Sequence, residues 1–249
     1  MTTFVAAGRR VLPRGWADLG RQLVIWFGFL VLYQLVRGMA DRSPQKAFDS
    51  GLWVIHFEQR TTHHLWELTL QRFASSSDFL EVMLSWTYWL SEFAVLGLAL
   101  LWVYLRRHEH FTRFRNAILL ANVIGLVGYA LAPTAPPRMF SAFGFADTLD
   151  QFGAVNHGSG LVQLAANPYA AMPSIHAADA MIVSAVLAYV CRSWPARILW
   201  LLWAPWVWFA VMATGNHFWL DCVAGAGVAA VATVAVYRRP LRRRLAARA

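Results

Sequence analysis

The sequence predicts an all-α protein: a polytopic membrane helix bundle with six transmembrane helices and an amphipathic outer loop. Hydrophobic residues make up 58% of the 249 positions. Charged residues make up only 14%, against about 25% in a typical soluble domain. Six uncharged apolar runs approach or reach the length that crosses a bilayer. Positive charge alternates between crowded and sparse loops. We therefore expect one membrane-embedded domain over residues 1–249.

The apolar runs define the six expected helices, in chain order, at 23–39, 79–105, 117–132, 177–190, 198–214 and 218–237. Arginines precede the first run as in a signal peptide, but no small-residue cleavage site follows Met39, so we expect an uncleaved helix. The third and fourth runs are short. They adjoin the proline-containing segments 133–137 and 172–176, where a helix can start or stop inside the protein rather than in lipid.

The arginines predict the orientation of the bundle, because positive charge in short loops stays cytoplasmic. One face receives most of them: Arg9, Arg10, Arg14, Arg21, Arg106, Arg107, Arg113, Arg115, Arg192, Arg197 and the basic tail at 238–249. The opposite face receives few, although its loops are longer. We expect a plasma-membrane protein with both termini in the cytoplasm. The net charge of +9 belongs to these inner loops, which argues against nucleic acid as a partner.

The outer loop between the first two runs predicts one or two amphipathic helices. Phe48, Leu52 and Ile55 recur at helical spacing, and the same spacing repeats at Trp66 and Phe73. Such helices are expected to lie on the outer membrane surface. Two interpretations stay open: a structural cap over the bundle, or a lid beside a site that lipids reach from the membrane.

Three polar motifs stand at the outer ends of the expected helices. They are Pro-Pro-Arg ending at Arg138, Pro-Ser-Ile-His ending at His176, and Gly-Asn-His-x-x-x-Asp, which holds His217 and Asp221. Ionisable groups at membrane depth are functional candidates by default. The i, i+4 spacing of His217 and Asp221 predicts an imidazole and a carboxylate on one helix face. That arrangement is typical of an oriented nucleophilic or basic histidine.

These residue types suit chemistry on phosphate esters at the extracytoplasmic face. A cation attracts the anion, while one imidazole attacks phosphorus and a second serves as an acid. The hydroxyl of Ser174 and the amides of Gly215 and Asn216 are further candidate donors to phosphate. Asp179, at i+3 from His176, is a candidate to orient that histidine. Taken singly, each residue also has a structural alternative: a snorkelling arginine, a helix cap through Ser174, or a His–Asp pair that joins helices.

The three motifs in this order resemble the type 2 phosphatidic acid phosphatase superfamily, and more narrowly its branch of inositol phosphorylceramide synthases and their bacterial relatives. The resemblance covers residues 116–237 closely, and the earlier part only in general layout. It implies that His217 is the nucleophile, held by Asp221, and that His176 is the acid and then the base. Arg138 would bind the phosphate. It further implies a lipid phosphate or phosphoinositol-type substrate drawn from the membrane lipids, a phosphohistidine intermediate, and no metal or cofactor.

Two cationic positions of the family pattern are apolar in this chain. Leu131 stands where the pattern has a lysine, and Ala210 and Val211 stand where it has Ser-Arg; Met139 replaces a proline. These departures favour the synthase-like branch over a plain phosphatidate phosphatase. Candidate replacement cations in the outer loop are Arg42, Lys46, Arg60 and Arg72.

Other interpretations stay open at this point. Glu92 falls in the middle of the second run, where a charge costs about 2.5–3.5 kcal/mol, so we expect it to be neutral, paired or beside a polar cavity. Asn122 is one candidate partner. A transporter or channel with a non-catalytic polar cluster is the alternative function, and a zinc site is a third possibility. The zinc ligands would be His176, His217, Asp221 and Asp179. Water and an alcohol hydroxyl are both open as acceptors, and the oligomeric state is open too.

Overall fold

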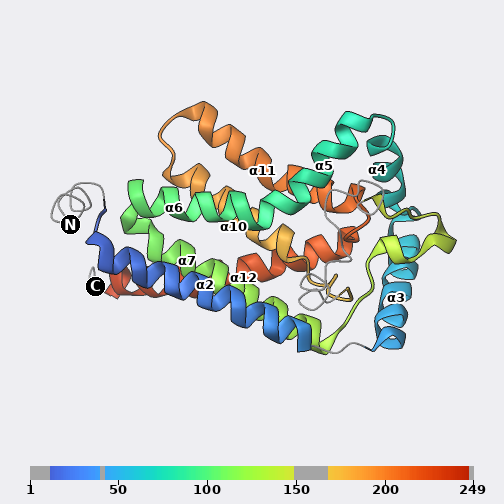
Figure 1. The fold of residues 1–249 in the computed structure, drawn as a ribbon, viewed down its shortest axis with the longest axis horizontal. Coiled ribbons are helices and arrows are strands. Elements are labelled where there is room, and N and C mark those ends of the chain that lie inside the picture. Colours follow the sequence, from blue (N-terminus) through green and yellow to red (C-terminus); the bar gives the residue numbers. More distant parts are fainter. Residues whose placement is uncertain (1–11, 40–42, 149–167, 247–249) are drawn as a thin grey trace.

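The computed structural model describes residues 12–39, 43–148 and 168–246 as a bundle of long helices capped at one end by shorter ones (Figure 1). Five segments are long and apolar enough to cross a membrane: Gly15–Val36, Asp78–Arg106, His108–Leu131, Trp194–Ala213 and Trp219–Arg238. A sixth apolar helix, Ile175–Val190, is shorter. All six predicted runs therefore fall on helices. The described residues contain no strand beyond a single bridge between Thr134 and Ala170.

The long helices are α2 (Gly15–Met39), α5 (Asp78–Leu90), α6 (Leu96–Arg106), α7 (His108–Leu131), α10 (Ile175–Val190), α11 (Trp194–Ala213) and α12 (Trp219–Ala246). A π-helical turn, Ser91–Val95, joins α5 to α6, so these two form one continuous span. Short 3-10 turns follow α7 at Pro137–Met139 and Ser141–Phe143. Helix α12 continues beyond the predicted end of the last run, because the basic tail prolongs the helix.

Helix α10 lies at the centre of the bundle, where it packs on α7, α11 and α12. Its neighbours come close to its first turn because they carry glycine there. A Cβ on Gly125 of α7 would lie 2.2 Å from Ile175 Cδ1, and one on Gly225 of α12 would lie 2.3 Å from Ser174 O. Small residues allow this close helix packing in membranes. A helix surrounded by others in this way can be shorter than a full span.

The outer loop forms α3 (Pro44–Thr62) and α4 (Trp66–Ala74), which stand beyond the ends of the long helices (Figure 1). The prediction of amphipathic helices is confirmed. Their apolar face packs on protein: Val54 and Ile55 belong to a buried cluster with Phe140 and Phe218. Gly51 has no room for a Cβ, which would lie 2.5 Å from the Phe140 ring. The structure therefore favours the cap interpretation of this loop.

Candidate active site

A cavity opens where α2, α5, α7 and α10 meet the loops that precede α10 and α12. Its empty volume is about 410 Å³, open mouth included. Arg138, His176, Asn216 and His217 all line it, so the structure brings together residues from all three sequence motifs. Its other lining side chains include Glu92, Tyr33, Tyr88 and Tyr129.

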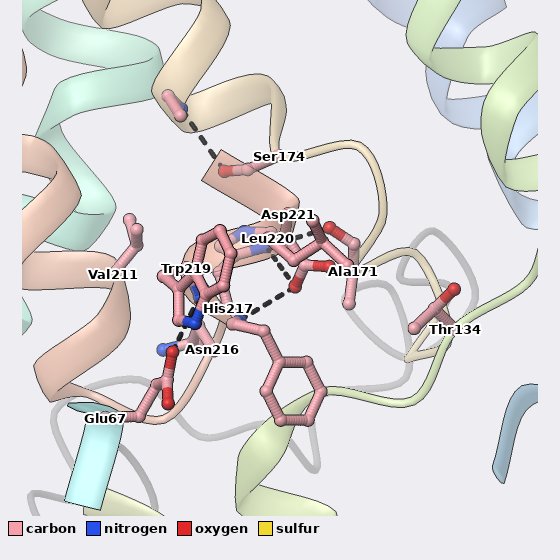
Figure 2. A network of polar contacts seen from close by, with 12 residues as sticks. Glu67, Thr134, Ala171, Ser174, Val211, Asn216, His217, Trp219, Leu220 and Asp221 are labelled. Carbon is pink, nitrogen blue, oxygen red and sulfur yellow. Dashed lines mark hydrogen bonds and ion pairs between the residues drawn. The ribbon is translucent and has the colours of Figure 1, made fainter. Parts of the chain in front are cut away.

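His217 lies just before α12, which begins at Trp219. Its Nδ1 is 2.9 Å from Ala171 O and 3.5 Å from Asp221 Oδ2 (Figure 2). Both partners of Nδ1 are acceptors, so Nδ1 carries the proton and the neutral imidazole keeps its lone pair on Nε2. The predicted contact between His217 and Asp221 is confirmed. The prediction of one shared helix face was wrong, because His217 precedes the helix and Asp221 lies in its first turn.

Asp221 also fixes the start of α12. Its Oδ2 accepts a hydrogen bond from Phe218 N at 2.8 Å, and its Oδ1 has no hydrogen-bond partner among the described residues. The main-chain oxygen of Asp221 accepts from Ser174 N at 3.0 Å. This bond ties the start of α10 to the first turn of α12. The second and third motifs are therefore held together by backbone as well as by side chains.

Two further carboxylates, which the sequence analysis missed, bind the next two amides of α12. Glu67 Oε1 accepts from Trp219 N at 2.6 Å (Figure 2). Glu58 Oε1 accepts from Leu220 N at 3.1 Å. First-turn amides have no partner within their own helix, so side-chain oxygens that accept from them stabilise the start of the helix. We call Glu58, Glu67 and Asp221 the carboxylate clamp.

Both glutamates of the clamp are fully buried. Burial, and then the neighbouring charge of Glu67, raises the pKa of Glu58 to about 9. Burial also raises the pKa of Glu67. The sequence pattern indicates the burial of Glu58, because Glu58 falls at i+4 from Val54 and i+3 from Ile55, on the buried face of its helix. Charged residues on such a face usually have a specific partner.

His176 is the second residue of α10 and faces a carboxylate on the π-helical turn. Its Nε2 lies 3.2 Å from Glu92 Oε2. The ring of Tyr88 stacks on the imidazole at a centroid distance of 4.4 Å. The rings of His176 and His217 are 5.8 Å apart, so the two histidines border the same small space.

Asn122, one candidate partner of Glu92, binds a different group. Its Nδ2 donates to both carboxylate oxygens of Asp179, each at 3.0 Å. Glu92 is paired as expected, but with His176 at 3.2 Å rather than with the candidate Asn122. Asp179 is buried and anchors α10 to α7 through Asn122.

The remaining predicted donors have structural partners. Ser174 is fully buried, and its Oγ accepts from Ala177 N at 3.2 Å. It therefore caps α10, which is the structural alternative that the sequence left open for this residue. The amide of Gly215 donates to Met212 O and the amide of Asn216 to Val211 O, each at 3.0 Å. The expectation of backbone donors from these two residues was wrong, because the turn after α11 uses both amides. Asn216 contributes its side chain to the cavity instead.

Arg138 is held from three directions. Its main-chain amide donates to Gly215 O at 2.9 Å, its Nη1 donates to Asn216 Oδ1, and its Nε lies 3.3 Å from Asp147 Oδ2. Gly215 has a φ of +70°, and a Cβ there would lie 3.3 Å from Arg138 Cβ, so glycine permits this approach.

Arg138 is the sole lysine or arginine that lines the cavity among the residues that the structure describes. Of the proposed replacement cations, Arg42 lies outside the described residues. Lys46, Arg60 and Arg72 are exposed on α3 and α4 and do not line the cavity. Within the described ranges, no group of three or more His, Cys, Asp or Glu side chains is arranged to hold a metal ion. The geometry therefore gives no support to the zinc alternative.

Comparisons with known proteins identify a family, a relative and a shared fold. A model of the PAP2 superfamily matches residues 52–235. A phosphoinositol dihydroceramide synthase of Bacteroides thetaiotaomicron is 26% identical over 199 residues, which cover 74% of this chain and 61% of that protein. The crystal structure of LpxE from Aquifex aeolicus shares the fold, with a TM-score of 0.50 at 19% identity over 69% of this chain and 94% of that one. The family match extends over most of the chain and includes all three motifs, and this chain therefore belongs to the PAP2 superfamily.

Proposed function

We propose that this protein is an integral membrane lipid phosphatase or phosphotransferase that works through a phosphohistidine on His217. One observation carries the proposal. The Nδ1 of His217 is held by two acceptors, which puts the proton on Nδ1 and the lone pair on Nε2, and His217 shares a cavity with a fixed arginine and a second histidine. An oriented imidazole beside a cation and an acid is what displacement at phosphorus requires.

In the first step, the Arg138 guanidinium binds the phosphate oxygens and stabilises charge in the transition state. His217 Nε2 then forms a bond to phosphorus while the bond to the alkoxide leaving group breaks. His176 gives its proton to that alkoxide. A positioned acid of this kind is worth about 10²–10⁴-fold in rate. Glu92, 3.2 Å from His176 Nε2, stabilises the imidazolium that donates this proton.

In the second step, an acceptor hydroxyl attacks the phosphohistidine. His176, now neutral, takes the proton of that hydroxyl, the phosphorus–nitrogen bond breaks, and His217 regains its lone pair. Water as the acceptor gives hydrolysis, and an alcohol gives transfer. The name of the Bacteroides relative supports the transfer of a phosphoinositol group to a sphingoid lipid as one candidate reaction.

The lipid reaches this site at the end of the bundle opposite the arginine-rich loops. Arg138 follows α7, His176 opens α10 and His217 precedes α12, so all three belong to one end. At the other end, Arg113 lies over the Tyr237 ring at 5.9 Å, which brings the start of α7 beside the end of α12. By the positive-inside rule, the catalytic end faces away from the cytoplasm.

The test is an assay of the detergent-solubilised protein on phosphatidic acid, an isoprenoid diphosphate, and phosphatidylinositol with and without a ceramide acceptor. Wild type is compared with His217→Ala, and His56→Ala serves as the matched control because His56 is exposed on α3. We expect turnover in wild type and control, with and without a chelator, and none in His217→Ala. Equal turnover by the His217→Ala variant would overturn the mechanism.

A further inference from the structure

A second and larger cavity runs along the outside of the bundle. It lies between α2 and the segment formed by the π-helical turn and α6. Its empty volume is about 1010 Å³, open side included. Apolar side chains from both helices form nearly all of its wall, among them Trp26 and Leu30 on α2 and Phe93 and Leu100 on the facing segment. We call this cavity the α2–α6 groove. Such a wall offers no partner to a polar head group.

The α2–α6 groove begins at the candidate active site, because Glu92 lines both cavities. From Glu92 to Tyr104 the helical path is about 18 Å long. At the far end the lining becomes polar: Arg115 Nη1 donates to Gln22 Oε1, and Tyr104 OH donates to Asp18 Oδ2 at 3.0 Å. The groove is therefore an apolar channel. One end opens at the catalytic cavity, and polar side chains close the other end.

We propose that the α2–α6 groove binds one alkyl chain of the lipid substrate while the phosphate occupies the catalytic cavity; this inference rests on the proposed function. Half of a bilayer's hydrocarbon core is about 15 Å thick. The groove, at about 18 Å, thus matches one alkyl chain in length. The chain moves into the groove from surrounding lipid that is equally apolar. Hydrophobic transfer therefore contributes little to the binding free energy of the chain. Its contribution is to orient the head group toward His217, which lowers the entropic cost of reaching a reactive geometry.

Gly97 offers a way to obstruct this groove without disturbing its walls. It lies in the groove wall, and a Cβ added there meets no heavy atom within 4 Å. It lies about 7.5 Å along the helix from Glu92, so a large side chain there blocks all but the first part of the channel. Gly28 on α2 is the matched control, since its Cβ position is equally open but it does not line the groove.

The experiment is photolabelling of the full-length protein in vesicles that contain phosphatidic acid with a diazirine near the end of one alkyl chain. Labelled peptides are mapped by mass spectrometry, with unlabelled dipalmitoyl phosphatidic acid as competitor. We expect competable labelling of α2 and α6 in wild type and in Gly28→Phe. In Gly97→Phe we expect that labelling to be lost, because the added ring fills the channel.

Equal competable labelling of wild type and Gly97→Phe overturns the groove proposal, as does label spread evenly over all lipid-facing helices. The variant His217→Ala separates this outcome from the proposed function. If the groove binds the chain, His217→Ala keeps the α2 and α6 labelling although it releases no phosphate. Phosphate release by His217→Ala would refute the phosphohistidine mechanism. The labelling would still decide whether the groove binds the alkyl chain.

Discussion

Glu58 and Glu67 come from different helices of the outer cap, yet they bind successive amides of α12. Glu67 accepts from Trp219 N at 2.6 Å and Glu58 from Leu220 N at 3.1 Å. Both side chains are fully buried, and their carboxyl groups also interact with each other. The cap thereby fixes the first turn of α12, immediately after His217.

Two substitutions of Glu58 distinguish the effect of its hydrogen bonds from the effect of its charge. Glu58→Gln keeps an acceptor for Leu220 N and adds a donor toward Glu67, so we expect near wild-type turnover. Glu58→Ala leaves a buried amide without a partner, which costs about 1–3 kcal/mol of stability. We also expect its kcat to fall, because the start of α12 and His217 lose their support. Thermal unfolding and steady-state kinetics in detergent measure both effects.

The matched control is Gln59→Ala, an exposed position next along α3. Gln59→Ala is expected to change neither the unfolding temperature nor kcat. Equal kcat values for Glu58→Ala and Gln59→Ala would show that the clamp does not position His217.

The same clamp predicts how stability depends on pH. Burial and the charge of Glu67 raise the pKa of Glu58 from its ordinary 4.5 to about 9 in the folded state, and Asp221 adds to the effect. A carboxyl with a raised folded pKa binds more protons folded than unfolded, so its stabilisation is complete below pH 4.5 and disappears as the pH rises through about 9. Relative to Glu58→Gln, the wild-type unfolding temperature should therefore decline across this window. Parallel curves for the two proteins would contradict a raised pKa of Glu58 in the folded state.

The spans were predictable from sequence because crossing a membrane requires little more than apolar length. The gathering of Arg138, His176 and His217 at one cavity was also predictable, since all three stand at the same ends of apolar runs. The spacing of α3 places Glu58 on a buried face, but its partner on α12 was not predictable, because the two meet only through the packing of α3 against the bundle. No local pattern links positions so far apart in the chain.

The amides of Gly215 and Asn216 illustrate a different limit of sequence reasoning. A glycine beside a catalytic histidine suggests backbone donors to phosphate, but the turn after α11 directs both amides to carbonyls of α11. The contact of His176 was missed for a related reason, because its i+3 spacing pointed to Asp179. Helical spacing predicts neighbours along one helix, whereas the contact with His176 joins the π-helical turn to another helix. Such π turns are frequent at functional sites.

Glu92 is expected to act through His176 rather than on the substrate directly. Glu92→Gln retains a hydrogen-bonding group but loses the charge that stabilises the imidazolium, so kcat should fall while KM changes little. The loss should be smaller than the roughly 10²–10⁴-fold expected for His176→Ala, which removes the acid itself. Glu109→Gln, exposed at the opposite end of the bundle, is the control. A rise in KM with unchanged kcat would instead indicate that Glu92 contacts the substrate.

The orientation of the site can be tested without any substrate. A reporter that is active only outside the cytoplasm, fused after Phe140, should be active, because Phe140 follows α7 at the catalytic end. The same reporter fused after Arg192, between α10 and α11, should be inactive. The reverse pattern would place the catalytic cavity on the cytoplasmic side and would refute the orientation derived from the arginines.

Arg138→Lys tests whether the phosphate is held by a planar fork or merely by a positive charge. A lysine keeps the charge but presents a single ammonium, so it cannot bridge two phosphate oxygens while also contacting Asn216 and Asp147 as the guanidinium does. The loss of one charge-assisted hydrogen bond predicts a fall in kcat/KM of about tenfold to a hundredfold. Inhibition by vanadate should weaken in parallel. Arg60→Lys, on the exposed face of α3, provides the control. Wild-type kcat/KM in Arg138→Lys would mean that charge alone suffices, and that two-point binding of the phosphate by this side chain contributes nothing to the reaction.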